Sequence, residues 1–172
     1  MIFATIGNDK RPFIRFNKLV LLISDLFPKE EIIYQKGHNK FLHKKNNILD
    51  QDFFDRDQFF KYLKESSLVL THAGAGTLMQ LSKLKKVPYV LPRSSNFHEH
   101  LNNHQIETLA QFKFINLAKE IQYPFDEINL KEGILIDLNK NNKMNNSNIA
   151  SQENNPLLIS IRNYVEKYLD NS

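Results

Sequence analysis

The chain has 172 residues, of which 41% are hydrophobic, and its formal net charge is +4. This length and composition predict one globular domain with its own core, and no stretch approaches the ~20 apolar residues that a membrane span needs. The absence of cysteine excludes disulfides, thiolate zinc sites and cysteine nucleophiles, and lysines that are spread along the chain argue against a nucleic-acid-binding surface.

Short apolar runs alternate with helical patterns along the chain. The first run has no positive segment or cleavage-like site beside it, so we expect a strand, no signal peptide and a cytoplasmic location. Strands are predicted at Ile2–Ile6, Ile32–Gln35, Ile48–Gln51, Leu68–Thr71, Tyr89–Leu91 and Phe114–Leu117. Helical spacing follows Pro12 and precedes the fourth strand. This alternation predicts an α/β fold, a Rossmann-like parallel sheet with flanking helices.

Glycines follow several of these strands, and the richest loop follows the fourth. Gly7 comes after the first strand, whereas Gly37, after the second, fits an ordinary tight turn better than a site. Residues 72–77 read His-Ala-Gly-Ala-Gly-Thr and lead into a helical pattern. Such a turn directs unpaired backbone N–H groups and the positive end of a helix dipole at one spot, which predicts a cradle for phosphate.

Other interpretations of this loop fit less well. Met79 stands where a dinucleotide fingerprint needs a small residue, so a nicotinamide cofactor is not expected. The chain has neither the Gly-Lys-Ser/Thr of a nucleotide-binding P-loop nor a serine nucleophile elbow. We expect the His72 imidazole to donate to phosphate oxygen, while Thr77 fits a ligand contact and a helix cap equally.

A second polar segment, residues 92–105, follows the Tyr89–Leu91 strand. It concentrates arginine, histidine, glutamate, asparagine and glutamine side chains, which suit sugar or nucleotide hydroxyls. A zinc site is an alternative, because His100 and His104 lie one helical turn apart, near His98 and Glu99, but it is not expected, since no supporting second layer of partners is evident. A solvated helix start above core residues is the plainer alternative.

The C-terminal part differs in composition from the rest. Residues 139–155 are rich in asparagine and poor in apolar side chains, which predicts a flexible linker. Residues 156–172 carry an apolar face at helical spacing, which predicts an amphipathic last helix that folds back or contacts a partner.

The two polar segments together resemble the carboxyl-terminal, donor-binding domain of glycosyltransferase family 28, the family of the lipid II synthase MurG. The shared pattern is His-Ala-Gly-x-Gly-Thr at residues 72–77, then proline, then Asn-His-Gln at residues 103–105. The chain is most similar to short one-domain members of the PssE or EpsF type, whose opening resembles residues 1–13. The resemblance covers residues 1 to about 114 and implies one GT-B half, with residues 1–138 as the donor-binding domain.

For function, the resemblance implies the catalytic subunit of a two-component inverting transferase. Such a protein moves a hexose or N-acetylhexosamine from a UDP-sugar to a polyprenyl-diphosphate-linked sugar in capsule or exopolysaccharide synthesis. A membrane-associated PssD-like subunit would bind the acceptor, which would place the chain at the inner face of the membrane. No metal or other cofactor is implied, because helix dipoles and backbone amides take the place of a divalent cation. The alternatives are a noncatalytic UDP-sugar-binding enhancer of a partner transferase and a UDP-sugar epimerase, whose site one lobe does not close.

Site residues carry over by position. The expected donor-binding residues are Gly7, Asn8, His72, Ala73, Gly74, Ala75, Gly76, Thr77, Gln80, Arg93, Glu99, His100, Asn103 and Gln105. Gln80 stands where related members carry a ribose-binding glutamate, so the charge-assisted contact is lost. His72, Glu99 and His100 are the catalytic candidates, and the general base is left open between the partner and the loop Asn8–Arg11.

Overall fold

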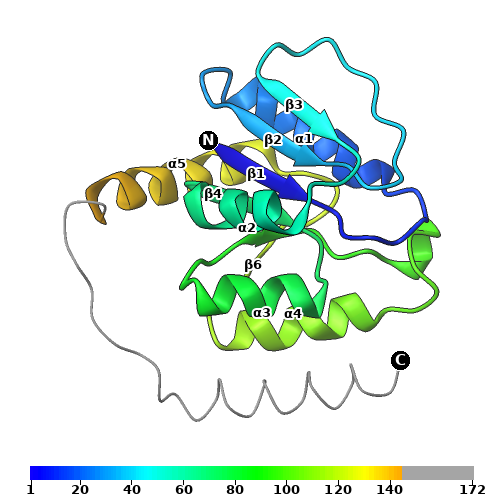
Figure 1. Cartoon of the computed structure of the whole chain (residues 1–172). Coiled ribbons are helices and arrows are strands. Elements are labelled where there is room, and N and C mark those ends of the chain that lie inside the picture. Colours follow the sequence, from blue (N-terminus) through cyan, green and yellow to red (C-terminus); the bar gives the residue numbers. More distant parts are fainter. Residues whose placement is uncertain (145–172) are drawn as a thin grey trace.

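The computed structural model describes residues 1–144, which form a parallel sheet with helices on both faces (Figure 1). The strands are β1 (Ile2–Thr5), β2 (Ile32–Gln35), β3 (Ile48–Gln51), β4 (Leu68–Thr71), β5 (Tyr89–Val90) and β6 (Lys119–Glu120). The helices are α1 (Ile14–Leu26), α2 (Arg56–Glu65), α3 (Ala75–Lys83), α4 (His104–Phe114) and α5 (Glu127–Met144), with a short 3₁₀ helix, η1, at Ser95–Phe97.

The sheet order β3-β2-β1-β4-β5-β6 is that of a doubly wound Rossmann fold, so the predicted fold class is confirmed. All the strand pairs run parallel, and Thr5 at the end of β1 pairs with Thr71 at the end of β4. The strand order reverses between β1 and β4, because β2 lies on one side of β1 and β4 on the other. The carboxyl ends of β1 and β4 therefore border the crevice where open α/β sheets bind ligands.

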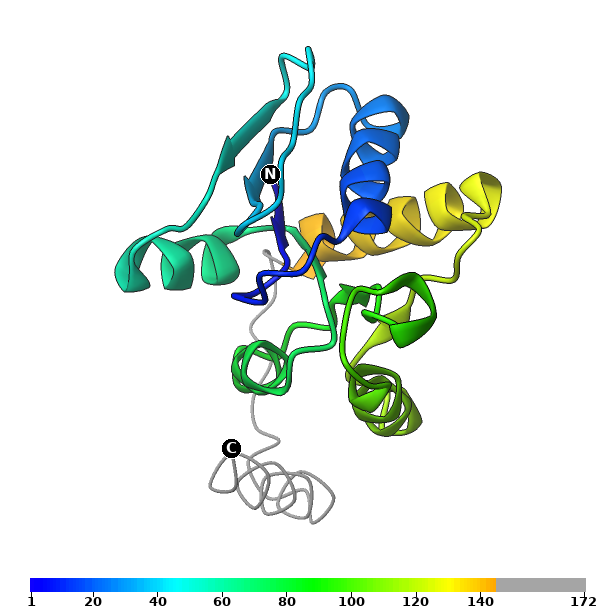
Figure 2. The same cartoon turned by 90° about the vertical axis from the view of Figure 1, so that its right-hand side faces the viewer.

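Apolar side chains on both faces of the sheet explain why the inner strands β1 and β4 are nearly continuous hydrophobic runs. On one face α1 and α5 pack against β1 and β4, where Phe16, Leu19 and Ile134 are fully buried. On the other face α2 and α3 cover Phe3 and neighbouring strand residues, and α3 and α4 share a further cluster. Figure 2 shows α1 and α5 on the opposite side of the sheet from α2.

The strand predicted at Phe114–Leu117 is wrong. The helix α4 continues through Phe114, Asn116 turns the chain with φ of 58°, and β6 begins only at Lys119. The apolar pattern has another cause, because Ile115 and Leu117 pack against the cluster shared by α3 and α4.

The helix α5 was not predicted, and it overlaps the expected linker. Ile134 and Leu138 bury this helix against the sheet, and the Tyr89 hydroxyl donates a hydrogen bond to Asp137 (2.8 Å). Because α5 runs through Met144, residues 139–144 are helical instead of flexible; the rest of the expected linker and the helix 156–172 lie outside the described residues. No helix within residues 1–144 has the length and apolar character to cross a membrane.

Candidate functional site

The loops after β1 and β4 meet at the His72 side chain. This imidazole is buried and lies against two glycines, Gly7 after β1 and Gly74 after β4. A Cβ on Gly7 would lie 2.6 Å from His72 Nε2, and Gly7 also has a left-handed φ of 71°. A Cβ on Gly74 would clash with the same ring. The two glycines are therefore needed to seat the histidine.

His72 is a neutral side chain in this setting. Burial, and after it the charge on Arg93, lower its pKa to about 4. The ring nitrogen Nδ1 lies 3.3 Å from the Thr71 hydroxyl, and the backbone N–H of His72 donates to the Thr5 carbonyl. The imidazole thus holds the two loops together, and its burial removes it from the candidates for a proton-accepting base.

The first turn of α3 has the geometry of an anion cradle. Gly74 is the N-cap, and the first helical hydrogen bond runs from the Leu78 N–H to the Gly74 carbonyl (3.1 Å). Among the residues that the structure describes, the N–H groups of Ala75, Gly76 and Thr77 have no acceptor. Thr77 lies inside the helix, so the cap alternative for its hydroxyl is wrong.

Gly76 differs from Gly7 and Gly74 in what surrounds it. A Cβ built on Gly76 meets nothing within 4 Å, so no packing within residues 1–144 requires glycine there. Gly76 is exposed, and it belongs to the same first turn of α3 as the free N–H groups. This combination fits a site that reserves room for a ligand close to the backbone.

Gln105 joins this loop to the loop after β5. Its carbonyl oxygen accepts from the backbone N–H groups of Ala73 (3.2 Å) and Arg93 (3.0 Å). Asn103 instead ties its own loop together, because its carbonyl oxygen accepts from the backbone N–H and the hydroxyl of Ser95. The oxygens of both expected donor-binding amides are therefore engaged with the protein.

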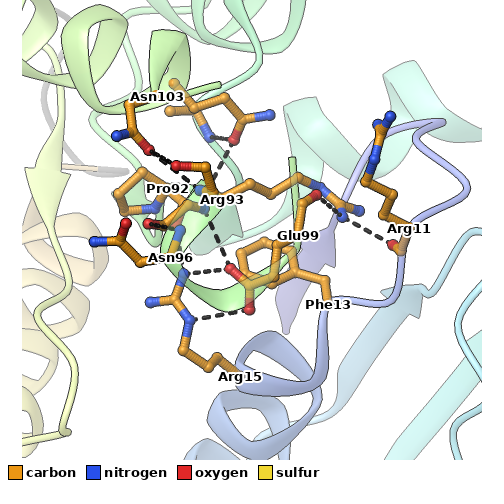
Figure 3. Close-up of polar contacts among 12 residues, drawn as sticks. Arg11, Phe13, Arg15, Pro92, Arg93, Asn96, Glu99 and Asn103 are labelled. Atoms are coloured by element: carbon orange, nitrogen blue, oxygen red, sulfur yellow. Dashed lines mark hydrogen bonds and ion pairs between the residues drawn. The ribbon is translucent and has the colours of Figure 1, made fainter. Parts of the chain in front are cut away.

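Glu99 is buried in an ion pair and does not face a donor. The Arg15 guanidinium binds both carboxylate oxygens, one through Nε at 3.0 Å, and also donates to the Pro92 carbonyl. The Glu99 carboxylate faces the Arg15 guanidinium in Figure 3. The Phe97 ring lies 4.2 Å from the Arg15 guanidinium carbon. Glu99 thus anchors the loop after β5 to α1, which corrects the expectation of a sugar contact or catalytic role.

Arg93 is likewise buried beneath the site, with no exposed surface. Its guanidinium stacks on the Phe13 ring and donates to the carbonyls of Arg11 (2.9 Å) and Glu99 (3.2 Å), while Nε has no partner within residues 1–144. Figure 3 shows the side chain extending toward Arg11. Arg93 therefore holds the loops after β1 and β5 together and contributes positive charge from the protein interior. Because it has no exposed surface, the expected direct contact with a donor is not supported.

Asp9 and His100 face each other at the rim of the same site. The Asp9 carboxylate accepts from the Arg11 backbone N–H (2.8 Å) and its guanidinium, and it lies 3.8 Å from His100 Nε2. Burial raises the pKa of Asp9, but the Arg11 hydrogen bond and the charges of Arg93 and Arg11 outweigh it and hold the pKa below its usual value. Both side chains remain about one-fifth to one-quarter exposed, at 21% and 24%.

Sequence reasoning missed Arg15, and it included Asp9 and Arg11 only as part of the loop Asn8–Arg11, a possible source of the base. Two features of the sequence could have pointed to Arg15: it lies beside the apolar stripe of α1, and Glu99 is the one glutamate in residues 92–105. Only the fold shows that Arg15 and Glu99 form a pair. Of the remaining expected residues, Asn8 is exposed and Gln80 is partly buried on α3. His98, His100 and His104 are not gathered, and residues 1–144 contain no group of three or more histidine or acidic side chains placed to hold a metal.

Comparisons with known proteins agree with this architecture. The model of the glycosyltransferase family 28 C-terminal domain matches residues 2–160. A comparison with curated protein sequences found no match. The crystal structure of the glycotransferase of kitacinnamycin is similar with a TM-score of 0.56 at 14% identity, over 82% of this chain and 38% of that one.

A second solved structure, the glycosyltransferase SnogD from Streptomyces nogalater, aligns with a TM-score of 0.41 at 12% identity, over 96% of this chain and 43% of that one. The chain thus spans less than half the length of each of these two proteins.

Proposed function

Because the chain belongs to the glycosyltransferase family 28 C-terminal domain family, we propose that it is the donor-binding, catalytic subunit of a two-component inverting glycosyltransferase. Its donor is a UDP-sugar that supplies a hexose or N-acetylhexosamine. Its acceptor is a polyprenyl-diphosphate-linked sugar in capsule or exopolysaccharide synthesis. No metal takes part, and the chain lies at the inner face of the membrane through its partner.

The observation that carries this proposal is the first turn of α3. The N–H groups of Ala75, Gly76 and Thr77 lack acceptors within residues 1–144, and the space over Gly76 is open. A departing diphosphate needs compensation of its negative charge, which unpaired N–H groups and the helix dipole provide without a cation. The buried Arg93 adds positive charge beneath the same loops.

One feature of the site supports a partner subunit. Around the loops of the site, large apolar side chains are exposed, among them Ile14 (61%), Phe97 (49%) and Leu101 (79%). Such a rim fits a surface that a second lobe covers when the site closes.

The test is a sugar-transfer assay in membranes. Membranes that contain polyprenyl-diphosphate-linked saccharides and the acceptor-binding subunit are mixed with the full chain, labelled UDP-sugars and EDTA. We expect label in the lipid fraction only when both proteins are present. Transfer that needs a divalent cation, or that proceeds equally without this chain, contradicts the proposal.

The second candidate is a noncatalytic enhancer that binds UDP-sugar for a partner transferase. Gln80 favours it, because a neutral amide stands where related members carry a glutamate. The Gly76→Val variant separates the two in the same assay. Loss of all transfer indicates the catalytic role, whereas a remaining rate equal to that of the partner alone indicates the enhancer.

A further inference from the structure

The loop between β2 and β3 runs along α1. Asn39 Oδ1 accepts from the Phe13 backbone N–H at the start of this helix (3.0 Å). One turn further, the Asn17 side chain donates to the Lys40 carbonyl (3.0 Å). Successive residues of the loop therefore lie beside successive turns of the helix.

Leu42 projects from this loop and is 94% exposed. Its two neighbours in the sequence are anchored. The Phe41 ring is buried against Tyr34, with 5.1 Å between the ring centres, and His43 Nε2 lies 2.9 Å from Asp50 Oδ1. A single exposed leucine is common on protein surfaces, but here both flanking side chains hold the leucine outside. Its exposure is thus built into the fold.

Three exposed lysines accompany Leu42. Lys40 and Lys44 lie two residues before and after it and, like it, face solvent. Lys18 lies on α1 next to Asn17, the residue that binds the loop. Among the residues that the structure describes, none of these three lysines has an acidic partner. We call Lys18, Lys40, Leu42 and Lys44 the lysine–leucine surface.

Acidic side chains near this surface are already paired or absent. Residues 36–47 contain none, and Asp25, the single acid of α1, pairs with Lys45. Asp50 on the edge strand β3 accepts from Lys36 (2.7 Å). The lysine–leucine surface therefore combines uncompensated positive charge with an exposed aliphatic side chain.

We propose that the chain binds anionic membrane surfaces directly through the lysine–leucine surface. Negative headgroups attract the lysines, and an aliphatic side chain between them gains free energy on entering the boundary with the acyl chains. A nucleic acid matches less well, because its bases stack on exposed aromatic rings, whereas Phe41 and Tyr34 are buried. This contact is separate from the partner subunit, through which the proposed function places the chain at the membrane.

The lysine–leucine surface adjoins the candidate site. Its loop starts at Gly37, where a Cβ would lie 2.9 Å from the Gly7 carbonyl oxygen. The rim residue Ile14 lies one turn before Lys18 on α1. A chain that rests on the membrane through this surface therefore has its site close to the lipid headgroups.

Flotation of the full chain with lipid vesicles, without partner subunit or UDP-sugar, tests the contact. The vesicles contain phosphatidylcholine alone or together with about 30% phosphatidylglycerol. A double variant, Lys40→Gln with Lys44→Gln, removes two charges from the surface. The matched control, Lys61→Gln with Lys64→Gln, removes two exposed lysines of α2, on the opposite side of the sheet from α1. Thermal denaturation establishes that each variant is folded.

We expect binding to the anionic vesicles only, and weaker binding at high salt. Loss of Lys40 and Lys44 should lower the partition coefficient by about 10- to 30-fold, since each lysine near an anionic surface contributes about five-fold. The control pair should change it by less than about two-fold, because salt screens distant charges. No binding, equal binding to neutral vesicles, or an equal decrease in the control overturns the proposal.

Insertion of the leucine is measured separately, because the chain contains no tryptophan. In Leu42→Trp, we expect the emission to move to shorter wavelength with anionic vesicles and to be quenched by lipids with brominated acyl chains. Phe114→Trp, at an exposed position on α4, is the control and should not respond. Emission of Leu42→Trp that stays that of a water-exposed ring at saturating lipid overturns the proposal.

A parallel titration with polyuridine distinguishes a nucleic-acid surface. RNA that binds more tightly than the anionic vesicles, and loses affinity in the Lys40→Gln, Lys44→Gln variant, also overturns the proposal. None of these assays contains UDP-sugar or the partner subunit, so each of these failures leaves the proposed transferase function standing.

Discussion

Gly76→Val separates ligand binding from folding because of what surrounds Gly76. A Cβ there meets nothing within 4 Å, and the residue lies in the first turn of α3. Valine and glycine differ in helix propensity by about 0.5 kcal/mol, which corresponds to about 2 °C in Tm for a chain of this size. The variant should therefore fold with nearly unchanged stability.

Binding should respond differently, because valine adds bulk in the first turn of α3, which holds the free N–H groups. A hydrogen bond to a charged group contributes about 1.5–3 kcal/mol, so loss of two such bonds raises the Kd for UDP by about 100-fold or more. Calorimetry of the full chain in EDTA measures the affinity, and thermal denaturation measures the stability. Ala110→Val, on the exposed face of α4, is the control for adding the same side chain.

Two results refute this reasoning. Wild-type affinity for UDP in Gly76→Val means that the diphosphate does not bind at the first turn of α3. A decrease in Tm of more than about 8 °C, or roughly 2 kcal/mol or more for a chain of this size, means that Gly76 is packed against other groups.

Three further predictions concern the support of the site. Gly74→Ala forces a methyl group into the His72 ring and should destabilise the fold by about 1–3 kcal/mol; a Tm equal to the wild type contradicts the close approach. Glu99→Ala leaves Arg15 buried without its counter-charge, so it should lower the free energy of unfolding, measured by urea denaturation, by about 3–5 kcal/mol. A decrease of less than about 1 kcal/mol would show that solvent screens the pair. His72 has a pKa of about 4 when folded and 6.5 otherwise, so the unfolded chain binds more protons between these values. The free energy of unfolding should therefore fall by about 2 kcal/mol from pH 7 to pH 5, and a slope that persists in His72→Gln assigns it to other groups.

The parallel sheet was predictable because its signal is local. Buried strands such as Ile2–Thr5 and Leu68–Thr71 are short apolar runs, and helical spacing lies between them. The wrong strand prediction at Phe114–Leu117 also came from a local signal. Ile115 and Leu117 pack beneath the end of α4, and a short apolar segment of this kind has the composition of a strand. The helix α5 was not predicted because its apolar residues show only weak helical periodicity. Its stability comes mainly from tertiary contacts of Ile134 and Leu138.

The candidate site was predictable in location but only partly in roles. The glycine-rich turn and the strand ends predict that residues 72–77 lie at the carboxyl edge of the sheet, and the fold has them there, between β4 and the first turn of α3. The sequence does not reveal which polar side chains are bound to other protein groups. Glu99 and Arg93 look like ligand contacts until long-range partners, 84 residues away in the case of Arg15 and Glu99, are known. Asp9 belongs to the loop Asn8–Arg11, which the sequence left open as a source of the base, but only the fold places it opposite His100.

The most direct test of the anion cradle is amide NMR of the ¹⁵N-labelled full chain during titration with UDP in EDTA, with UMP as the control that lacks the second phosphate. The chain has only five glycines, so the Gly76 resonance lies in a sparse region of the spectrum. The account predicts that Ala75, Gly76 and Thr77 show the largest downfield amide proton shifts and that UMP shifts them less. Shifts that spare these three amides while others move, or no shifts at saturating UDP, would contradict it.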